Sequence, residues 1–172
     1  TTLYGTDLYG EARLPQLLRG LCGIEGIRWI RLLYCYPERI TDELLEVMAK
    51  EDKILKYMDL PLQHCSRQVL RAMNRQGDRE SLSALIRKIR EKVPGIVLRT
   101  TFMVGFPGET EEAFEELAEF AKEMRFERMG CFAYSQEEGT PAARLPDQIS
   151  REIKEHRQEL MMEQQMALMD EM

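Results

Sequence analysis

The sequence predicts an α/β fold built on a parallel sheet. Short β-rich apolar runs alternate with amphipathic helical patterns at intervals of roughly 30–40 residues, as in repeated βαβ units. The runs are apolar on both faces, as in strands that helices cover on both sides. We therefore predict four strands and about six helices, which make about half of an eight-stranded barrel or most of an open sheet.

The first third of the chain supplies two of these strands. A helical pattern over residues 14–21 precedes a first strand at Trp29–Cys35, which Pro37 ends. Thr41 is a suitable N-cap for the next helix because its hydroxyl can accept from a free backbone N–H. A second strand follows at Tyr57–Leu62.

The middle of the chain alternates in the same way. Ser66 is placed to cap a short helix, and a longer helix from about Asp78 ends at Pro94-Gly95. The third strand is predicted over Val97–Val104.

A glycine-rich turn at Gly105–Gly108 separates that strand from the next helix, which Thr110 caps. The fourth strand covers Met129–Tyr134, and a polar helix runs from about Ser150 toward the end of the chain.

Composition limits the class of protein. With 44% apolar and 31% charged residues, the 172-residue chain has the balance of a soluble domain. No apolar run approaches the roughly 20 residues of a membrane helix, so we expect no membrane association and a cytoplasmic protein. The net charge of −6 disfavours a domain dedicated to phosphate backbones and suits plain solubility, a small molecule or a basic protein partner. The chain opens without Met and ends inside a helical pattern, so we expect both ends to be cuts.

The four cysteines are Cys22, Cys35, Cys65 and Cys131. They form no C-x-x-C pair, which excludes a local zinc or cluster motif within these residues. We expect each to be a small buried side chain and predict no metal ligand in the chain.

Polar residues gather where the predicted strands end, which is where α/β folds place working residues. These ends are Tyr34–Pro37, Pro61–His64, Gly105–Glu109 and Tyr134-Ser135. The Gly105 turn permits close approach of a ligand to the backbone, or is simply a tight strand-to-helix turn.

Three side chains are candidates on chemical grounds. Gln63 and His64 can both donate and accept hydrogen bonds, although a lone His is more often structural. Arg99 in a buried strand needs a partner, either a ligand carboxylate or a barrel acid such as Asp59. Strand alternation places Arg99 on the same side as Thr101.

Several segments together resemble one family, the radical S-adenosylmethionine methylthiotransferases. They are Thr100–Thr110 around the glycine turn, Tyr134-Ser135 with Glu138–Ala142, and Val69–Arg75. The resemblance covers essentially the whole chain and implies an incomplete, TIM-like radical SAM barrel with parallel strands and outer helices. Against the general glycine motif of radical enzymes, Glu109 falls one place late.

The family has two main branches. One modifies an adenosine in transfer RNA, and the other modifies the β-carbon of an aspartate in a small-subunit ribosomal protein. The stretches Pro61–His64, Thr101–Met103 and Tyr4–Gly10 are similar to the ribosomal-protein branch. The transfer-RNA branch and a non-catalytic α/β binding module remain alternatives.

The resemblance also implies cofactors and chemistry. S-adenosylmethionine is cleaved reductively at a [4Fe-4S] cluster, a second cluster supplies sulfur, and an electron donor completes the partners. We predict that the cofactor-binding residues are Gln63, His64, Arg99, Thr101, Gly105, Phe106, Tyr134 and Ser135. No catalytic residue is assigned.

Two consequences concern organisation. We expect residues 1–149 to form the partial barrel domain, and residues 150–172 a helix leading toward a missing TRAM-type domain. The three-cysteine cluster loop of the family lies outside this chain, so we expect the parent to be an enzyme and residues 1–172 alone to be inactive.

Overall fold

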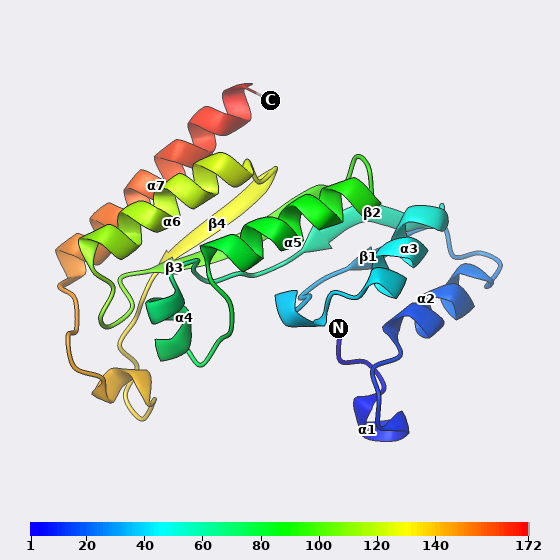
Figure 1. The fold of residues 1–172 in the computed structure, drawn as a ribbon, viewed down its shortest axis with the longest axis horizontal. Helices are drawn as coiled ribbons and strands as arrows, with labels where there is room; N and C mark the ends of the chain where they lie inside the picture. Colours follow the sequence, from blue (N-terminus) through cyan, green and yellow to red (C-terminus); the bar gives the residue numbers. More distant parts are fainter. Residues whose placement is uncertain (172) are drawn as a thin grey trace. The chain divides into compact units, whose positions relative to one another are not determined.

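A computed structural model describes residues 1–171 and confirms an α/β fold with four strands (Figure 1). The strands lie in the order β1-β2-β3-β4 within one sheet. The α-helices are α1 (Thr6–Tyr9), α2 (Leu14–Cys22), α3 (Asp42–Lys50), α4 (Arg67–Ala72), α5 (Arg79–Lys92), α6 (Glu111–Met124) and α7 (Arg151–Glu171), and two 3-10 turns are η1 (Pro37–Arg39) and η2 (Ala142–Arg144). The strands are β1 (Ile30–Leu32), β2 (Ile54–Asp59), β3 (Val97–Val104) and β4 (Arg128–Ala133).

The strands pair in parallel, as the βαβ pattern predicts. In β1 and β2, Ile30 pairs with Ile54, and the register shifts before Leu32 meets Met58. In β2 and β3 the register is regular from the Tyr57–Val97 pair to the Asp59–Arg99 pair.

The chain divides into two compact units. The first comprises Thr1–Pro61 and Ala84–Arg99, and the second comprises Leu62–Ser83 and Thr100–Met172. The boundary therefore passes through α5 and through β3, and each unit is described by itself below.

The first unit is organised around α3, which packs on β2. Thr41 caps this helix as predicted, since its Oγ1 accepts from the Leu44 N–H at 3.2 Å. Leu45 and Met48 on the apolar stripe of the helix are fully buried, as is Met58 of β2. Burial of these side chains, at about 25 cal/mol per Å² of apolar surface, holds the helix against the strand.

The second unit has an aromatic core. Phe102 of β3 lies edge-on to Phe120 of α6, with centroids 6.2 Å apart, and to Phe126, at 5.9 Å. All three rings are fully buried. Thr110 caps α6 as predicted by accepting from the Ala113 N–H at 3.2 Å, so the helix begins where its phenylalanine face meets the strand.

Strand β3 has one buried and one half-exposed side. Leu98, Thr100, Phe102 and Val104 are buried, whereas the alternate residues from Val97 to Met103 are only partly covered. This alternation places Arg99 and Thr101 on the less covered side, where a ligand has room to approach.

The last helix packs on β4 and α6 (Figure 1). Met161 of this helix is fully buried. Two glutamines fasten the helix to backbone carbonyls: Gln158 Nε2 donates to the Cys131 carbonyl at 2.9 Å, and Gln165 Nε2 donates to the Phe126 carbonyl at 3.1 Å. Packing of the helix on β4 and α6 accounts for the buried methionine.

The structure differs from the sequence predictions in some boundaries. The first strand is only Ile30–Leu32 because Tyr34 adopts a left-handed backbone, with φ of 55°. The second strand begins and ends three residues earlier than predicted, at Ile54–Asp59. The additional helix among residues 1–171 is the single turn α1, and Ser66 precedes α4 without a side-chain cap bond.

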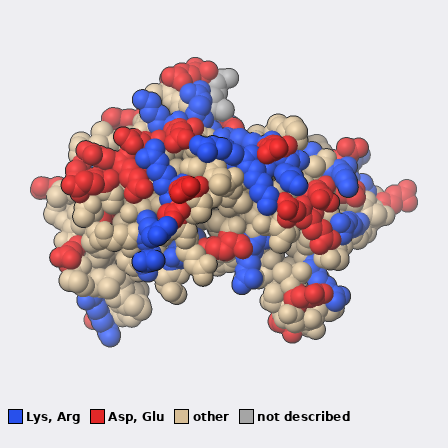
Figure 2. All heavy atoms as spheres, viewed as in Figure 1, with Lys and Arg blue, Asp and Glu red and all other residues tan. Residues whose placement is uncertain are grey.

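Charged side chains of both signs are interspersed over the face shown in Figure 2. The net charge of −6 is the difference between 30 acidic and 24 basic residues.

Candidate functional site

A cavity of about 360 Å³ opens in the second unit beyond the carboxyl end of β3. Its lining is mostly apolar, with an amide and a guanidinium among the polar groups. The lining residues are Gln63, Ala72, Met73, Asn74, Arg75, Met103, Phe106, Thr140, Pro141 and Ala142. The volume lies within the roughly 300–1,000 Å³ of pockets that hold small ligands and cofactors.

The cavity brings together three segments that are far apart in the sequence. Asn74-Arg75 follows α4, Phe106 belongs to the glycine turn, and Thr140–Ala142 precedes and opens η2. Each segment belongs to one of the motifs on which the family resemblance rests. Their convergence on one cavity is the strongest indication that it is the functional site.

Gln63 reaches the cavity through an extension of the sheet. Its N–H donates to the Thr101 carbonyl at 2.9 Å, and its own carbonyl accepts from the Met103 N–H at 2.8 Å. The residue forms an isolated parallel bridge with Phe102 and has a left-handed φ of 70°. A non-glycine residue at positive φ is uncommon and is typical of functional sites.

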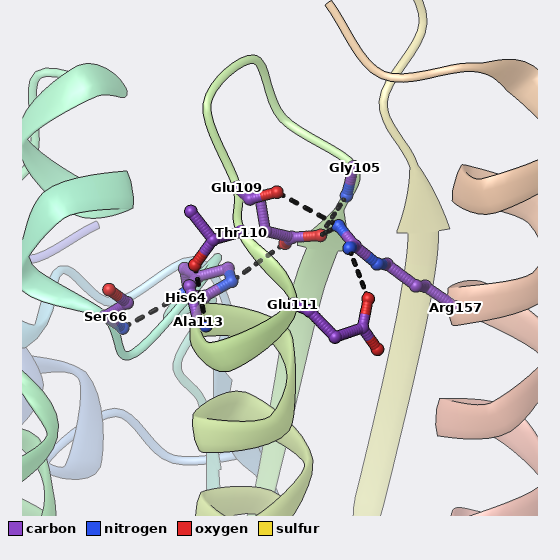
Figure 3. Close-up of polar contacts among 8 residues, drawn as sticks. All are labelled: His64, Ser66, Gly105, Glu109, Thr110, Glu111, Ala113 and Arg157. Atoms are coloured by element: carbon purple, nitrogen blue, oxygen red, sulfur yellow. Dashed lines mark hydrogen bonds and ion pairs between the residues drawn. The ribbon is translucent and has the colours of Figure 1, made fainter. Parts of the chain in front are cut away.

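The turn that follows β3 is held by the buried carboxylate of Glu109 (Figure 3). Its Oε1 accepts from the Gly105 N–H at 2.8 Å and from Arg157 Nη1 at 2.7 Å. Its Oε2 lies 2.9 Å from His64 Nε2. Although Glu109 is one place late in the glycine motif, its side chain closes the turn upon Gly105.

His64 is fully buried within this network. Its Nδ1 accepts from the Ser66 N–H at 3.0 Å, which assigns the ring proton to Nε2 and makes that nitrogen the donor to Glu109. Both ring nitrogens are thus bonded inside the protein. In this arrangement His64 supports the turn, whereas its neighbour Gln63 lines the cavity.

Arg157 joins the terminal helix α7 to the turn (Figure 3). Besides Glu109, it binds Glu111 at the start of α6, with Nη2 2.8 Å from Oε2. The guanidinium also lies 5.3 Å from the Phe114 ring centroid. One arginine therefore holds two carboxylates and connects α7 to the segment that lines the cavity.

Sequence reasoning missed Glu109 and Arg157 as organisers of the site. From the sequence, Glu109 is notable only for falling one place late in the glycine motif, and its partner lies 48 positions away on a helix that is polar overall. Arg75 was also missed as a lining residue, although it closes the Val69–Arg75 motif.

Tyr134 and Ser135 follow β4. The Tyr134 ring lies edge-on to Phe106, with centroids 5.1 Å apart, and Lys154 Nζ is 5.3 Å from its centroid. The Tyr134 hydroxyl is buried and has no hydrogen-bond partner within residues 1–171. Ser135 is exposed and donates to Glu137 Oε1 at 2.6 Å.

A separate polar cluster lies in the first unit, where β1 and β2 end. The buried Asp59 carboxylate accepts from the Tyr34 N–H at 3.1 Å and from Arg99 Nη1 at 3.2 Å. Of the two partners proposed for Arg99, the structure therefore shows Asp59.

The four cysteines are free thiols. Burial raises the pKa of Cys35 to about 11 and that of Cys131 to about 12, and it also raises the pKa of Cys65. Within the described residues 1–171, no three His, Cys, Asp or Glu side chains are grouped to hold a metal ion. A [4Fe-4S] cluster, which requires thiolates converging on one point, does not fit these cysteines.

The class of protein is shown by comparison with known families. A family model described as the Radical SAM superfamily matches residues 1–121, and the chain belongs to that superfamily. The expected incomplete radical SAM barrel is confirmed.

Comparison with curated proteins shows which branch of the family this chain resembles. Proteins from Lachnoclostridium phytofermentans, Desulforamulus reducens and Desulfitobacterium hafniense are 54%, 57% and 55% identical over 98%, 91% and 96% of this chain. Each is named ribosomal protein uS12 methylthiotransferase RimO. The chain spans 38%, 35% and 37% of their lengths. The predicted resemblance to the ribosomal-protein branch is confirmed.

Solved structures agree at the level of the fold. Escherichia coli coproporphyrinogen III oxidase HemN, a radical SAM enzyme, has a TM-score of 0.62 at 20% identity, over 83% of this chain and 32% of its own. The radical SAM methyltransferase TsrM of Kitasatospora setae has a TM-score of 0.55 at 20% identity, over 69% and 24%. Among residues 1–171, no helix is long and apolar enough to cross a membrane.

Proposed function

We propose that this chain is part of the barrel domain of an enzyme that adds a methylthio group to the β-carbon of an aspartate in ribosomal protein uS12. The observation that carries this proposal is the shared name of the curated relatives, which are 54–57% identical over at least 91% of the chain. A uS12 substrate would place the enzyme in the cytoplasm, and the net charge of −6 suits a basic protein partner.

The cavity of the second unit fits S-adenosylmethionine chemically. Gln63 offers an amide to hydroxyl groups, and Arg75 offers a guanidinium suited to a carboxylate. Met103 and Phe106 provide apolar surface.

These residues would bind and orient the cofactor. When bound, one molecule of S-adenosylmethionine would supply the methyl group, and a second, cleaved reductively, would supply the means to remove a hydrogen from an unactivated carbon. The chain's own part is to position the cofactor and to exclude water, with Phe106 and Met103 as the apolar wall. The Glu109 network would keep Phe106 in place by fixing the Gly105 turn.

The cluster of the parent enzyme would take its ligands from outside this chain, since the cysteines described here do not converge. Residues 1–172 by themselves are therefore proposed to be inactive. We assign residues 1–149 to the barrel domain and 150–172 to a helix that leads toward a TRAM-type domain. An electron donor would be a further partner.

The proposal is tested with the full-length enzyme that carries this chain, reconstituted anaerobically and offered uS12 or transfer RNA. Methylthiolated uS12, detected by mass spectrometry, is the expected product. A methylthiolated adenosine with unmodified uS12 would move the enzyme to the transfer-RNA branch. Absence of both products would overturn the proposal.

Variants of the same enzyme test the cofactor cavity. Gln63→Ala and Arg75→Ala should each raise the KM for S-adenosylmethionine by about tenfold or more, because each removes a polar contact to the ligand. Gln68→Ala and Arg71→Ala on the exposed side of α4 are matched controls and should leave that KM unchanged. If Gln68→Ala and Arg71→Ala raise the KM as much as Gln63→Ala and Arg75→Ala do, Gln63 and Arg75 do not belong to the cofactor site.

A further inference from the structure

The Asp59 carboxylate is the centre of the polar cluster in the first unit. Its side chain is 1% exposed, so its charge depends on protein donors instead of water. One oxygen accepts from the Tyr34 N–H and the other from Arg99 Nη1. A single buried carboxylate thus fixes the backbone at the end of β1 and a side chain of β3.

The Arg99 guanidinium is only partly used by this contact. A guanidinium carries five N–H donors in a rigid plane. Within residues 1–171, the bond to Asp59 Oδ1 is the only hydrogen bond of the Arg99 side chain, which is 43% exposed. With one edge held by Asp59, the remaining donors form a fork of the shape that binds a carboxylate through two parallel bonds.

The fold already contains an arginine that binds two acids. Arg157 contacts both Glu109 and Glu111, at 2.7 and 2.8 Å, and is 7% exposed. Its second acid is supplied by the chain. In the described part of the chain, Arg99 has one acid only and stands on the half-exposed side of β3, so a second carboxylate would have to come from a ligand.

Tyr34 supplies an independent sign of function. It is a bulky residue with a left-handed φ of 55°, a conformation that costs free energy and persists only where contacts impose it. Its N–H is held by Asp59 while its side chain remains 69% exposed. A strained residue at the carboxyl end of a parallel strand, tied to the same acid as Arg99, is typical of a ligand site.

We propose that Arg99, oriented by Asp59, binds the side-chain carboxylate of the substrate residue and selects aspartate over asparagine. The inference rests on the proposed function and names the recognition element for its substrate. Asp59 is a positioning residue, because it acts through the guanidinium. Arg99 was predicted to bind the cofactor, whose α-carboxylate is the other source of the same chemistry, and the two sources must be separated by experiment.

The test is a cycle of enzyme and substrate variants in the full-length enzyme. The dissociation constant is measured for uS12 with Asp or Asn at the modified position, for wild-type enzyme and for Arg99→Gln. Wild-type enzyme should prefer the Asp form by at least tenfold, and Arg99→Gln should lose that preference while its KM for S-adenosylmethionine stays within twofold. Arg99→Lys, which keeps the charge without the fork, should retain only part of the preference.

Controls separate recognition from folding. Arg19→Gln removes another half-exposed arginine of the first unit, which binds Glu43 at 2.7 Å, and should leave the preference intact. Asp59→Asn should reduce the preference without removing the arginine. Circular dichroism and iron content identify variants that have lost the fold.

The outcomes are distinct. If wild-type enzyme modifies uS12 and Arg99→Gln keeps the same Asp-to-Asn ratio, the inference is overturned and the proposed function stands. An unchanged ratio with a raised KM for S-adenosylmethionine also overturns it, by assigning Arg99 to the cofactor carboxylate. A wild-type enzyme that does not modify uS12 overturns the proposed function and with it the inference.

Discussion

Replacing Glu109 by leucine should destabilise the turn after β3 by about 3–5 kcal/mol, the range found when one member of a buried ion pair is removed. The carboxylate is fully buried and binds three donors, from His64, Gly105 and Arg157. Leucine fills a similar volume but accepts no hydrogen bond. The imidazole N–H and the Gly105 N–H would lose their acceptor, and the buried guanidinium would lose one of its two carboxylates.

Hydrogen exchange of the Gly105 amide measures this effect where it occurs. Since each 1.4 kcal/mol is a factor of ten, local opening should become roughly a hundred- to several-thousandfold more frequent in Glu109→Leu. Glu111→Gln is the control, because Glu111 binds the same arginine but is 64% exposed, and exposed pairs contribute only about 0–1 kcal/mol.

If the Gly105 amide exchanges at the same rate in Glu109→Leu and Glu111→Gln, the reasoning is refuted. Burial would then make no difference to how much an ion pair with Arg157 contributes to stability. The double variant Glu109→Leu/Arg157→Met adds a second check. Removing both charges should restore part of the protection, since an apolar pair of similar volume is often as stable as a buried ion pair. The His64 and Gly105 donors would still lack an acceptor, so recovery should be incomplete.

Three further predictions follow from packing, titration and backbone geometry. Phe102→Ala should cost the second unit about 3–5 kcal/mol of unfolding free energy by urea denaturation, whereas Phe132→Ala, at a ring 60% exposed, should cost within about 0.5 kcal/mol. Burial raises the pKa of the Cys35 thiol from 9.0 to about 11, so the folded state favours the neutral thiol. The free energy of unfolding should therefore be largest below pH 9 and should fall as the pH rises toward 11. In Cys35→Ala this fall should be smaller. Gly105→Ala would place a methyl group in collision with the Lys154 side chain, at a residue whose φ is +73°, so the variant should lower the melting temperature. Adding Lys154→Gly should relieve only the collision, because the backbone strain at residue 105 remains.

The third strand shows what local sequence determines. Val97–Val104 was predicted with its observed bounds because Pro94-Gly95 and Gly105 bracket an apolar and β-branched run that only Arg99 interrupts. The first strand was predicted too long for a tertiary reason. Asp59, far along the chain, binds the Tyr34 N–H and stabilises a left-handed residue in the middle of an apolar run.

The candidate site was predictable only in outline. The strand-end rule and the family motifs pointed to Gln63 and Phe106, which line the cavity. The role of His64, next to Gln63, could not be predicted from the sequence, because an imidazole is equally suited to bind a ligand or an internal acid. Glu109 decides between them, and nothing local to His64 announces that contact across 45 positions.

Two buried acids, Asp59 and Glu109, each form an ion pair with an arginine, and the roles of these pairs become clear only from the three-dimensional structure. Asp59–Arg99 and Glu109–Arg157 have the same chemistry and similar lengths, 3.2 and 2.7 Å. They differ in the arginine, which is 43% exposed in the first pair and 7% exposed in the second. Both Nη atoms of the buried Arg157 guanidinium are held by internal acids, although its Nε has no partner within residues 1–171, and this arginine serves the structure. A half-exposed guanidinium with a single acid keeps oriented donors for a ligand. Burial of the cation, which sequence does not specify, therefore separates the arginine that holds the turn from the arginine proposed to read the substrate.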